Sequence, residues 1–275
     1  MKDILPNAAL QKYVRMFQVF RFVFDKNIVP PIKHHYPRPE HCITFYIKDT
    51  QKFKYTNIEL IHSYPQCIIN GMHTTPVYRY GGNDFLAIKI VLRTAVLYQL
   101  LRFPLKEITN TFINAEDIWG HEVCSVCNRL KGLNELPEMI TVIENFIESQ
   151  IKKIKIDFQP IDEASDLLFD KENHVSIDWL ANQSCLSVRQ FIRKFEERIG
   201  ISAKTLACII RFDKAYRMKN RHPEYDWLFI AVSCNYYDYQ HMVKDFKEFS
   251  NLTPNSLYEL ELTAPERSFG FSYLT

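Results

Sequence analysis

The stretch from Ile177 to Leu257 repeats one pattern twice, and this repeat constrains the fold more than any other feature of the 275-residue chain. Each copy has a short amphipathic helix, a tight turn, a second helix with an apolar face, and an exit turn. The first copy runs from Ile177 to Gly200 and the second from Ile230 to Pro254. Gly200 and the stretch 251–254 end the second helices, as glycine, asparagine and proline commonly do. The repeat predicts two helix-turn-helix motifs, joined by a long helix over 203–218.

The second helix of the first copy has clearly separated faces. Phe191, Phe195 and Ile199 recur every four residues, which places them on one inward face. They are expected to pack on the preceding helix, against Ile177, Leu180 and Ala181. Arg189 and Arg193 lie one turn apart on the opposite face, and Ser187 is a candidate N-cap.

The second copy follows the same plan. Its inward residues are Met242, Phe246 and Phe249, expected to pack against Ile230, Ala231 and Tyr236. Asp238 is the candidate N-cap, and Asn235 is suited to a left-handed turn residue in place of glycine. The outward or flanking residues are Tyr239, Gln240, Val243, Lys244 and Lys247.

Charge is basic along the repeat. The chain carries a net charge of +2, with +5 in residues 1–160 and −3 in residues 161–275. Residues 187–247 nevertheless hold 12 basic and 7 acidic side chains, because the acids lie at the flanks. A local basic surface of this kind is typical of contact with nucleic acid.

A doubled helix-turn-helix with basic outer faces predicts binding to double-stranded DNA. Two arginines near a helix start can enter the major groove and bind guanine in a bidentate way. The helix N-terminus also favours a phosphate. The alternative is a solvated surface of an ordinary helical bundle, which two matching copies make less attractive. The candidate DNA-contacting residues are Ser187, Arg189, Gln190, Arg193, Lys194, Tyr239, Gln240, Val243, Lys244 and Lys247.

The N-terminal half has a different pattern. Up to about residue 91, short runs of aromatic and β-branched residues alternate with Pro, Gly and Asn, which predicts strands. From Thr94 the period becomes helical. We expect an α+β domain, with a small antiparallel sheet or partial barrel plus helices. The predicted strands are 16–24, 42–48, 58–62, 67–69, 77–80 and 85–91, and the predicted helices are 94–103, 115–130 and 136–151.

The sequence predicts two domains. Residues 1–152 form an effector-sensing or dimerisation domain, and 153–160 form a linker, since alternating charge there gives way to Pro160. Residues 161–262 form an all-α domain that begins with a helix over 161–169. Residues 263–275 are a C-terminal tail.

Residues 161–260 resemble the DNA-binding domain of AraC/XylS-type transcription regulators. The first motif matches at Ile177, Leu180-Ala181, Cys185-Leu186-Ser187, Phe191, Arg193 and Phe195; the second matches at Ile230-Ala231, Tyr236, Asp238, His241, Lys244, Phe246-Lys247 and Leu252-Thr253-Pro254. The resemblance implies a sequence-specific transcription regulator whose two recognition helices lie in successive segments of the major groove. By position, it implies base contacts from Arg189, Arg193, Tyr239, Gln240 and Lys244.

The chain departs from the family pattern at four positions. Asn235 and Asn251 stand in place of glycine, Met242 in place of an aromatic residue, and Lys244 in place of arginine. Lysine keeps the charge but loses bidentate geometry. Residues 1 to about 150 more faintly resemble the sensor-like domain that often precedes such motifs. The matching pieces are Leu10 to Val14, Pro39 to Ile47, Ile69 to Gly71, Phe85 to Leu92 and Ile118 to Gly120. This implies a small-molecule effector or a homodimer contact, and RNA polymerase as a partner if the protein is an activator.

Two clusters invite a metal or redox interpretation. His121, Cys124 and Cys127 have a spacing that zinc or redox sites use, and a metal or redox sensor or enzyme centred on them is the alternative function. Buried thiols beside an apolar stripe are the competing interpretation. His34-His35 and Glu40 lack the His-x-His spacing of cupin metal sites, so we expect no metal there. A third hypothesis makes the helical half a protein-docking module that does not bind DNA.

The remaining composition narrows the class of protein. Seven cysteines without a framework-like spacing favour reduced thiols in the cytoplasm. No apolar run reaches the length of a membrane span, and the first residues do not resemble a signal peptide. No P-loop, dinucleotide-binding turn, nucleophile elbow or paired-carboxylate motif occurs. We therefore expect no catalytic residues, no cofactor and no membrane partner.

Overall fold

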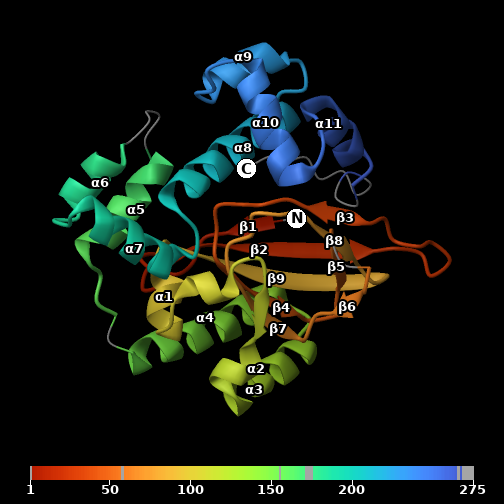
Figure 1. Ribbon diagram of the computed structural model, residues 1–275. Coiled ribbons are helices and arrows are strands. Elements are labelled where there is room, and N and C mark those ends of the chain that lie inside the picture. Colours follow the sequence, from red (N-terminus) through yellow and green to blue (C-terminus); the bar gives the residue numbers. More distant parts are fainter. Residues whose placement is uncertain (1, 57–58, 155, 171–175, 265–266, 268–275) are drawn as a thin grey trace.

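The computed structural model describes residues 2–56, 59–154, 156–170, 176–264 and 267. The N-terminal half begins with strands, and its helices follow (Figure 1). Its strands are β1 (Lys2–Ile4), β2 (Val14–Val23), β3 (Lys33–His35), β4 (Cys42–Tyr46), β5 (Lys52–Tyr55), β6 (His62–Ser63), β7 (Cys67–Asn70), β8 (Val77–Tyr80), β9 (Asp84–Leu92) and β10 (Phe112–Asn114). Its helices are α1 (Val96–Leu101), the 3-10 helix η1 (Leu105–Ile108), α2 (Ala115–Trp119), α3 (His121–Lys131) and α4 (Leu136–Lys153).

The strands form two antiparallel sheets that face each other. The larger sheet has the order β1-β2-β9-β4-β7-β10, and the smaller has the order β3-β8-β5-β6. Strands β2 and β9 pair along most of their length, from Val14↔Leu92 to Val23↔Asp84, and β9 and β4 are the two central strands of the larger sheet. This arrangement confirms the expected α+β fold with a small antiparallel sheet or partial barrel.

Each face of the larger sheet is covered. Phe17, Ile43 and Phe45 pack with α3 and α4 in one apolar core, and the ring of Phe146 in α4 meets that of Phe45 edge to face. The other face packs on the smaller sheet, where Phe22, Tyr46, Phe53, Tyr64 and Phe85 form an aromatic layer. Strand side chains alternate between the two faces, so each strand contributes to both layers.

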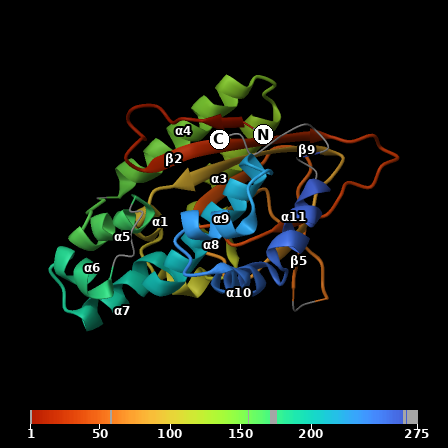
Figure 2. The same cartoon turned by 90° about the horizontal axis from the view of Figure 1, so that it is seen from above.

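The second half is all helical, as expected. It contains α5 (Pro160–Asp170), α6 (Ile177–Gln183), α7 (Val188–Ile199), α8 (Ala203–Arg221), α9 (Trp227–Ser233), α10 (Tyr239–Ser250) and α11 (Pro254–Leu262). Helix α8 connects the group α5–α7 with the group α9–α11 (Figures 1 and 2). A side-chain oxygen caps the N-terminus of every helix from α6 to α11, at Ser176, Ser187, Ser202, Asp226, Asp238 and Thr253.

Two of the predicted elements are wrong. Residues 59–61 of the predicted strand 58–62 have no strand pairing, and β6 begins at His62; Ile58 lies outside the described residues. The predicted helix 115–130 is two helices, because Gly120 adopts φ 54° and ends α2 before α3 begins. Helix α1 is also shorter than predicted, since Ala95 and Arg102 are left-handed at its two ends.

The two halves of the chain share a core. Tyr36 and Met72 from the N-terminal half pack among the helices of the second half, and the ring of Tyr36 meets that of Tyr216 in α8 at 5.8 Å. At the end of α7, the chain passes so close to the N-terminal half that a Cβ on Gly200 would lie 3.0 Å from the carbonyl oxygen of Leu105.

None of the helices in the described part of the chain combines the length and apolarity needed to span a membrane.

Candidate nucleic-acid interface and internal pocket

The two predicted turns have the same backbone hydrogen bonds. Leu186 N donates to Ala181 O at 3.0 Å, and Tyr236 N donates to Ala231 O at 2.9 Å. The preceding residues, Cys185 and Asn235, have φ 53° and φ 60°. Both turns therefore reverse the chain through one left-handed residue, as in the Schellman motif. Asn235 was predicted to do so, whereas Cys185 was not identified from the sequence.

The outer face of α7 presents cations to solvent. Arg189 and Arg193 are exposed, and neither has an ion-pair partner among the described residues. Phe191, Phe195 and Ile199 are fully buried on the opposite face. Val188 and Ile192 each directly precede one of these arginines and are 38% and 40% exposed. The sequence reasoning missed this apolar pair, which is chemically suited to thymine methyl groups in a major groove.

Ser187 and Gln190 hold the start of α7. Gln190 N donates to Ser187 Oγ at 3.3 Å, and Ser187 N donates to Gln190 Oε1 at 3.1 Å, forming a capping box. Their oxygens are thus engaged locally, and their role at a DNA surface would be to orient the helix. Lys194 is half-buried beside this face.

The outer face of helix α10 presents glutamine and lysine side chains instead of arginines. Gln240, Lys244 and Lys247 are exposed, whereas Tyr239 and Val243 are half-buried, and Tyr239 packs against the helical core. Tyr237 in the turn before α10 is 92% exposed. It was not among the predicted site residues, and its aromatic ring is the most prominent apolar group at the entrance of this helix.

A buried ion pair fixes α10 to α8. Arg211 donates to Asp245 Oδ2 through Nε and Nη2, at 3.2 and 2.8 Å. Its guanidinium also lies 4.4 Å from the ring centre of Tyr236. Only 11% of the Arg211 side chain and 7% of the Asp245 side chain are exposed. This cluster joins the linking helix, the turn and the second recognition helix.

The length of α8 sets the separation of the two motifs. Its 19 residues span roughly 28 Å at a rise of about 1.5 Å per residue. Successive major-groove segments on one face of B-DNA are about 34 Å apart. The length of the linking helix is therefore of the same order as this spacing, and about 6 Å shorter.

The C-terminal end of α7 contacts the N-terminal half. His41 Nε2 donates to Ile199 O at 2.9 Å, and Thr109 Oγ1 donates to Gly200 O at 2.7 Å. Tyr98 Oη donates to Glu197 Oε1 at 2.9 Å. The contacts lie at the opposite end of α7 from Arg189, so the predicted DNA face stays exposed.

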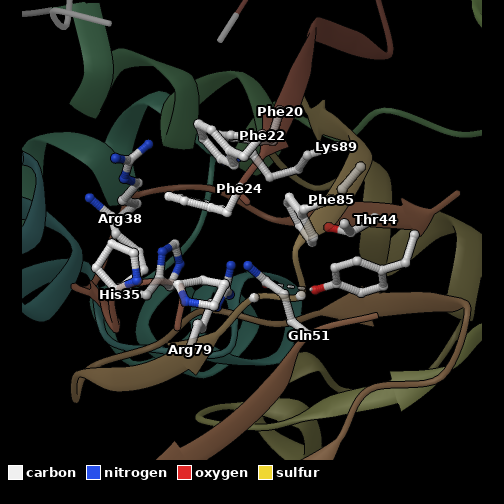
Figure 3. A pocket seen from close by; sticks show the side chains of 17 residues that line it. Phe20, Phe22, Phe24, His35, Arg38, Thr44, Gln51, Arg79, Phe85 and Lys89 are labelled. Carbon is white, nitrogen blue, oxygen red and sulfur yellow. Dashed lines mark hydrogen bonds between the residues drawn. The ribbon is translucent and has the colours of Figure 1, made fainter. Parts of the chain in front are cut away.

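A pocket lies between the two sheets, with about 780 Å³ of empty space including its mouth. One wall consists of Phe20, Phe22, Phe24 and Phe85 (Figure 3). Arg38, Arg79 and His35 lie on the side facing these rings (Figure 3). The aromatic strands 16–24 and 42–48 of the sequence could have lined a pocket or simply formed core; Phe20, Phe22, Phe24, Thr44 and Tyr46 from these strands line this pocket.

The pocket lining is cationic. It includes Lys33, Arg38, Arg79 and Lys89, and no Asp or Glu among the described residues. Lys89 is 2.6 Å from Glu40 Oε1, a carboxylate behind the wall; burial raises the pKa of Glu40, but Lys89 and Arg38 outweigh this and lower it to about 2. Arg79 has no carboxylate partner in the described part of the chain. Burial, with Arg79 next, holds the pKa of His35 well below its usual value, so that ring is neutral.

Neither of the two clusters that invited a metal interpretation forms a ligand set among the described residues. His121, Cys124 and Cys127 lie on α3, but the described residues contain no group of three side chains that could hold a metal. Cys127 instead contacts Cys67 of β7, and both are buried. His35 instead lines the pocket, and Glu40 forms an ion pair with Lys89, which also lines the pocket.

Comparisons with known proteins show the fold. No family model matches the chain, and no curated protein sequence matches it. The structure of ToxT from Vibrio cholerae O395 bound to (E)-4-(8-methylnaphthalen-1-yl)but-3-enoic acid is 13% identical, covers 90% of this chain and 99% of its own, and has a TM-score of 0.50. This chain therefore shares the two-part fold of ToxT.

Two further structures are similar to parts or all of the chain. A second ToxT structure from Vibrio cholerae O395 is 13% identical over 92% of this chain and 99% of its own, with a TM-score of 0.48. The DNA-binding domain of the global transcriptional factor AdpA, in complex with a target DNA, is 17% identical over 38% of this chain and 95% of its own, with a TM-score of 0.35.

Proposed function

We propose that this chain is an AraC/XylS-type, sequence-specific DNA-binding transcription regulator that responds to an effector through its N-terminal domain. One observation carries the proposal: two helix-turn-helix motifs with the same turn hydrogen bonds lie at the ends of one 19-residue helix. Their basic outer faces make no ion pair with any residue that the structure describes. No catalytic step is part of this function. The proposed division places residues 1–152 in the effector domain and 161–262 in the DNA-binding domain, with a linker between them.

DNA recognition is assigned to α7 and α10. Arg189 and Arg193 would contact base edges, because they are exposed near the start of α7 and have no competing ion pair among the described residues. Gln240 and Lys244 would do so from α10. Ser187 and Gln190 orient α7, and Lys194 and Lys247 supply phosphate contacts. Val188, Ile192 and Tyr237 extend the predicted set.

The pocket supports an amphipathic anion as effector. An apolar body would pack on Phe20, Phe22 and Phe24, and a carboxylate would pair with Arg79, whose guanidinium forms a fork suited to it. The ToxT structure named above holds an apolar molecule with a carboxylic acid, which has the same chemistry.

The proposal also includes two protein partners. They are a second copy of this chain, in a homodimer, and RNA polymerase if the protein is an activator. Both would bind surfaces other than the pocket.

A salt titration tests the DNA-binding proposal. The intact protein should bind fragments of genomic DNA with an affinity that falls steeply as salt rises, because phosphate contacts release counterions. It should also prefer a subset of fragments at every salt concentration. Absence of salt-dependent binding would favour the protein-docking hypothesis for the helical half.

A matched ligand pair tests the effector proposal. The naphthyl butenoic acid of the ToxT structure and its methyl ester differ only in charge at the headgroup. We expect the acid to bind more tightly than the ester, and Arg79→Gln to remove most of that difference while leaving ester binding unchanged. Equal binding of acid and ester to the unaltered protein would contradict an anionic effector.

A further inference from the structure

An ion pair connects the pocket directly to the last described helix of the DNA-binding half. Lys33, on β3, lines the pocket, and its Nζ lies 2.8 Å from Glu261 Oε1 of α11. Only 14% of the Lys33 side chain and 2% of the Glu261 side chain are exposed. The two residues are 228 positions apart in sequence, so this contact spans the proposed domains.

The segment around Lys33 contacts both the pocket and the helical half of the chain. His35 and Arg38 line the pocket, while Tyr36 between them packs in the helical core against Tyr216 of α8. Strand β3 is at the edge of the smaller sheet and pairs only with β8 among the described strands. A shift of β3 caused by a ligand would therefore change the contacts of this segment with α8 and α11.

We propose that Glu261 is an internal competitor for the pocket's anionic effector. An effector carboxylate that pairs with Lys33 competes with the Glu261 carboxylate for the same ammonium group. The weakened Lys33–Glu261 contact disfavours the docked position of α11. Effector binding and α11 docking are thus negatively coupled, and the coupling is reciprocal. This inference rests on the proposed function, because it requires an anionic effector in the pocket.

The coupling would reach the second recognition helix. Pro254 and Leu257 of α11 are buried against the helical core that contains Phe246 and Phe249 of α10. Trp227 at the start of α9 also donates to Asn255 Oδ1 of α11. Release of α11 therefore loosens the support of the whole second motif, while the first motif, at the other end of α8, keeps its own contacts.

The test is a comparison of Glu261→Gln with Glu259→Gln. Glutamine at 261 keeps the shape and a hydrogen-bonding oxygen but loses the charge that competes with the ligand. Glu259 is exposed on the same helix, so its variant makes the same change in net charge away from the pocket. Binding of the naphthyl butenoic acid and its methyl ester is measured for the intact protein and both variants.

We expect Glu261→Gln to bind the acid at least fivefold more tightly than the unaltered protein and the ester with unchanged affinity. Glu259→Gln should match the unaltered protein with both ligands. Equal acid affinity in Glu261→Gln and the unaltered protein, with the Arg79 dependence intact, would overturn the competition and leave the effector proposal standing. Failure of the acid to bind any of the three proteins would overturn both.

Amide hydrogen exchange on the unaltered protein gives a second measurement that needs no variant. The acid should accelerate exchange in residues 254–262, and the ester should not. Slower exchange in this helix with the acid would show that the ligand strengthens α11 docking, and would refute the proposed sign of the coupling.

Discussion

Single backbone positions determine how well each motif is built. Cys185 adopts φ 53° in the turn of the first motif, and it is exposed. A left-handed conformation costs a non-glycine residue roughly 1–2 kcal/mol. Asparagine tolerates it better, and Asn235 fills the same place in the second turn. The first motif therefore contains strain that the second has reduced.

Cys185→Gly should stabilise the protein by about 1 kcal/mol, because glycine adopts the left-handed conformation without a Cβ clash. Urea unfolding at equilibrium measures the change. Asn235→Gly is the matched control and should change stability by less. A loss of stability in Cys185→Gly would show that the thiol makes a contact worth more than the strain.

Arg193 carries the most specific residue-scale prediction for DNA. Arg193→Ala should lose about 1–3 kcal/mol on its cognate site and relax the preference at one base pair, because a bidentate contact to guanine is removed. Quantitative binding to a set of single-base variants of the site measures both effects. Arg129→Ala, on the exposed face of α3, is the control. Equal losses on every sequence for Arg193→Ala would refute its assignment to a base contact.

At the scale of elements, the repeat in the sequence predicted most of the helical half. The four-residue spacing of Phe191, Phe195 and Ile199 identified them as buried, because it reflects local helical periodicity. Ser187 and Asp238 were identified as N-caps by their residue types before each helix, which is also local information. The short strands β1, β3, β5 and β10 were not predicted. They are held by pairing with distant strands, a long-range effect that local pattern does not encode.

The aromatic wall of the pocket was open to prediction from the strands 16–24 and 42–48, but its cationic side was not, for the same reason. Lys33, Arg79 and Lys89 come from three strands in two sheets, and only the fold brings them to one cavity. The exposure of Arg189 and Arg193 on α7, and of Lys244 on α10, was by contrast accessible to prediction, because each set lies on one helix face. Their contact with DNA stays a prediction. The tertiary ion pair between Arg211 and Asp245 was also missed, since its partners are 34 residues apart.

The Arg211–Asp245 pair should hold the second motif onto α8. Asp245→Asn should destabilise the protein by about 3 kcal/mol, because the guanidinium stays largely buried without a carboxylate. Glu248→Gln, an exposed change on the same helix, should cost less than about 1 kcal/mol. Thermal and urea unfolding of both variants give the comparison, and similar small losses would mean that the pair contributes little to docking α10.

At the scale of the whole molecule, buried histidines make the joined halves sensitive to acid. Burial lowers the pKa of His41 to about 4, although the hydrogen bond to Ile199 O works in the other direction. Burial, with Arg79 next, lowers the pKa of His73 to about 3. Both values lie below the roughly 6.5 of an unfolded histidine, so the unfolded chain binds more protons as pH falls. The stability that these two neutral histidines allow is therefore fully present above about pH 6.5, and it decreases as the pH falls from there toward their folded-state pKa values.

His41→Gln should reduce this loss. Between pH 7 and pH 5, each buried neutral histidine costs roughly 2 kcal/mol of stability, and glutamine keeps a side-chain donor for Ile199 O without titrating. Urea unfolding at the two pH values measures the difference for the unaltered protein and the variant. An identical loss in both proteins would show that His41 is not one of the groups that titrate on unfolding.

The central claim is that one chain places two recognition helices on one face of a duplex, and selection from a random DNA library with the intact protein tests it most directly. The enriched sequences should contain two short elements with centres about 10 base pairs apart. Arg193→Ala should alter one element and Gln240→Ala the other. Enrichment of a single element that both variants weaken alike, or of no sequence at all, would contradict the account.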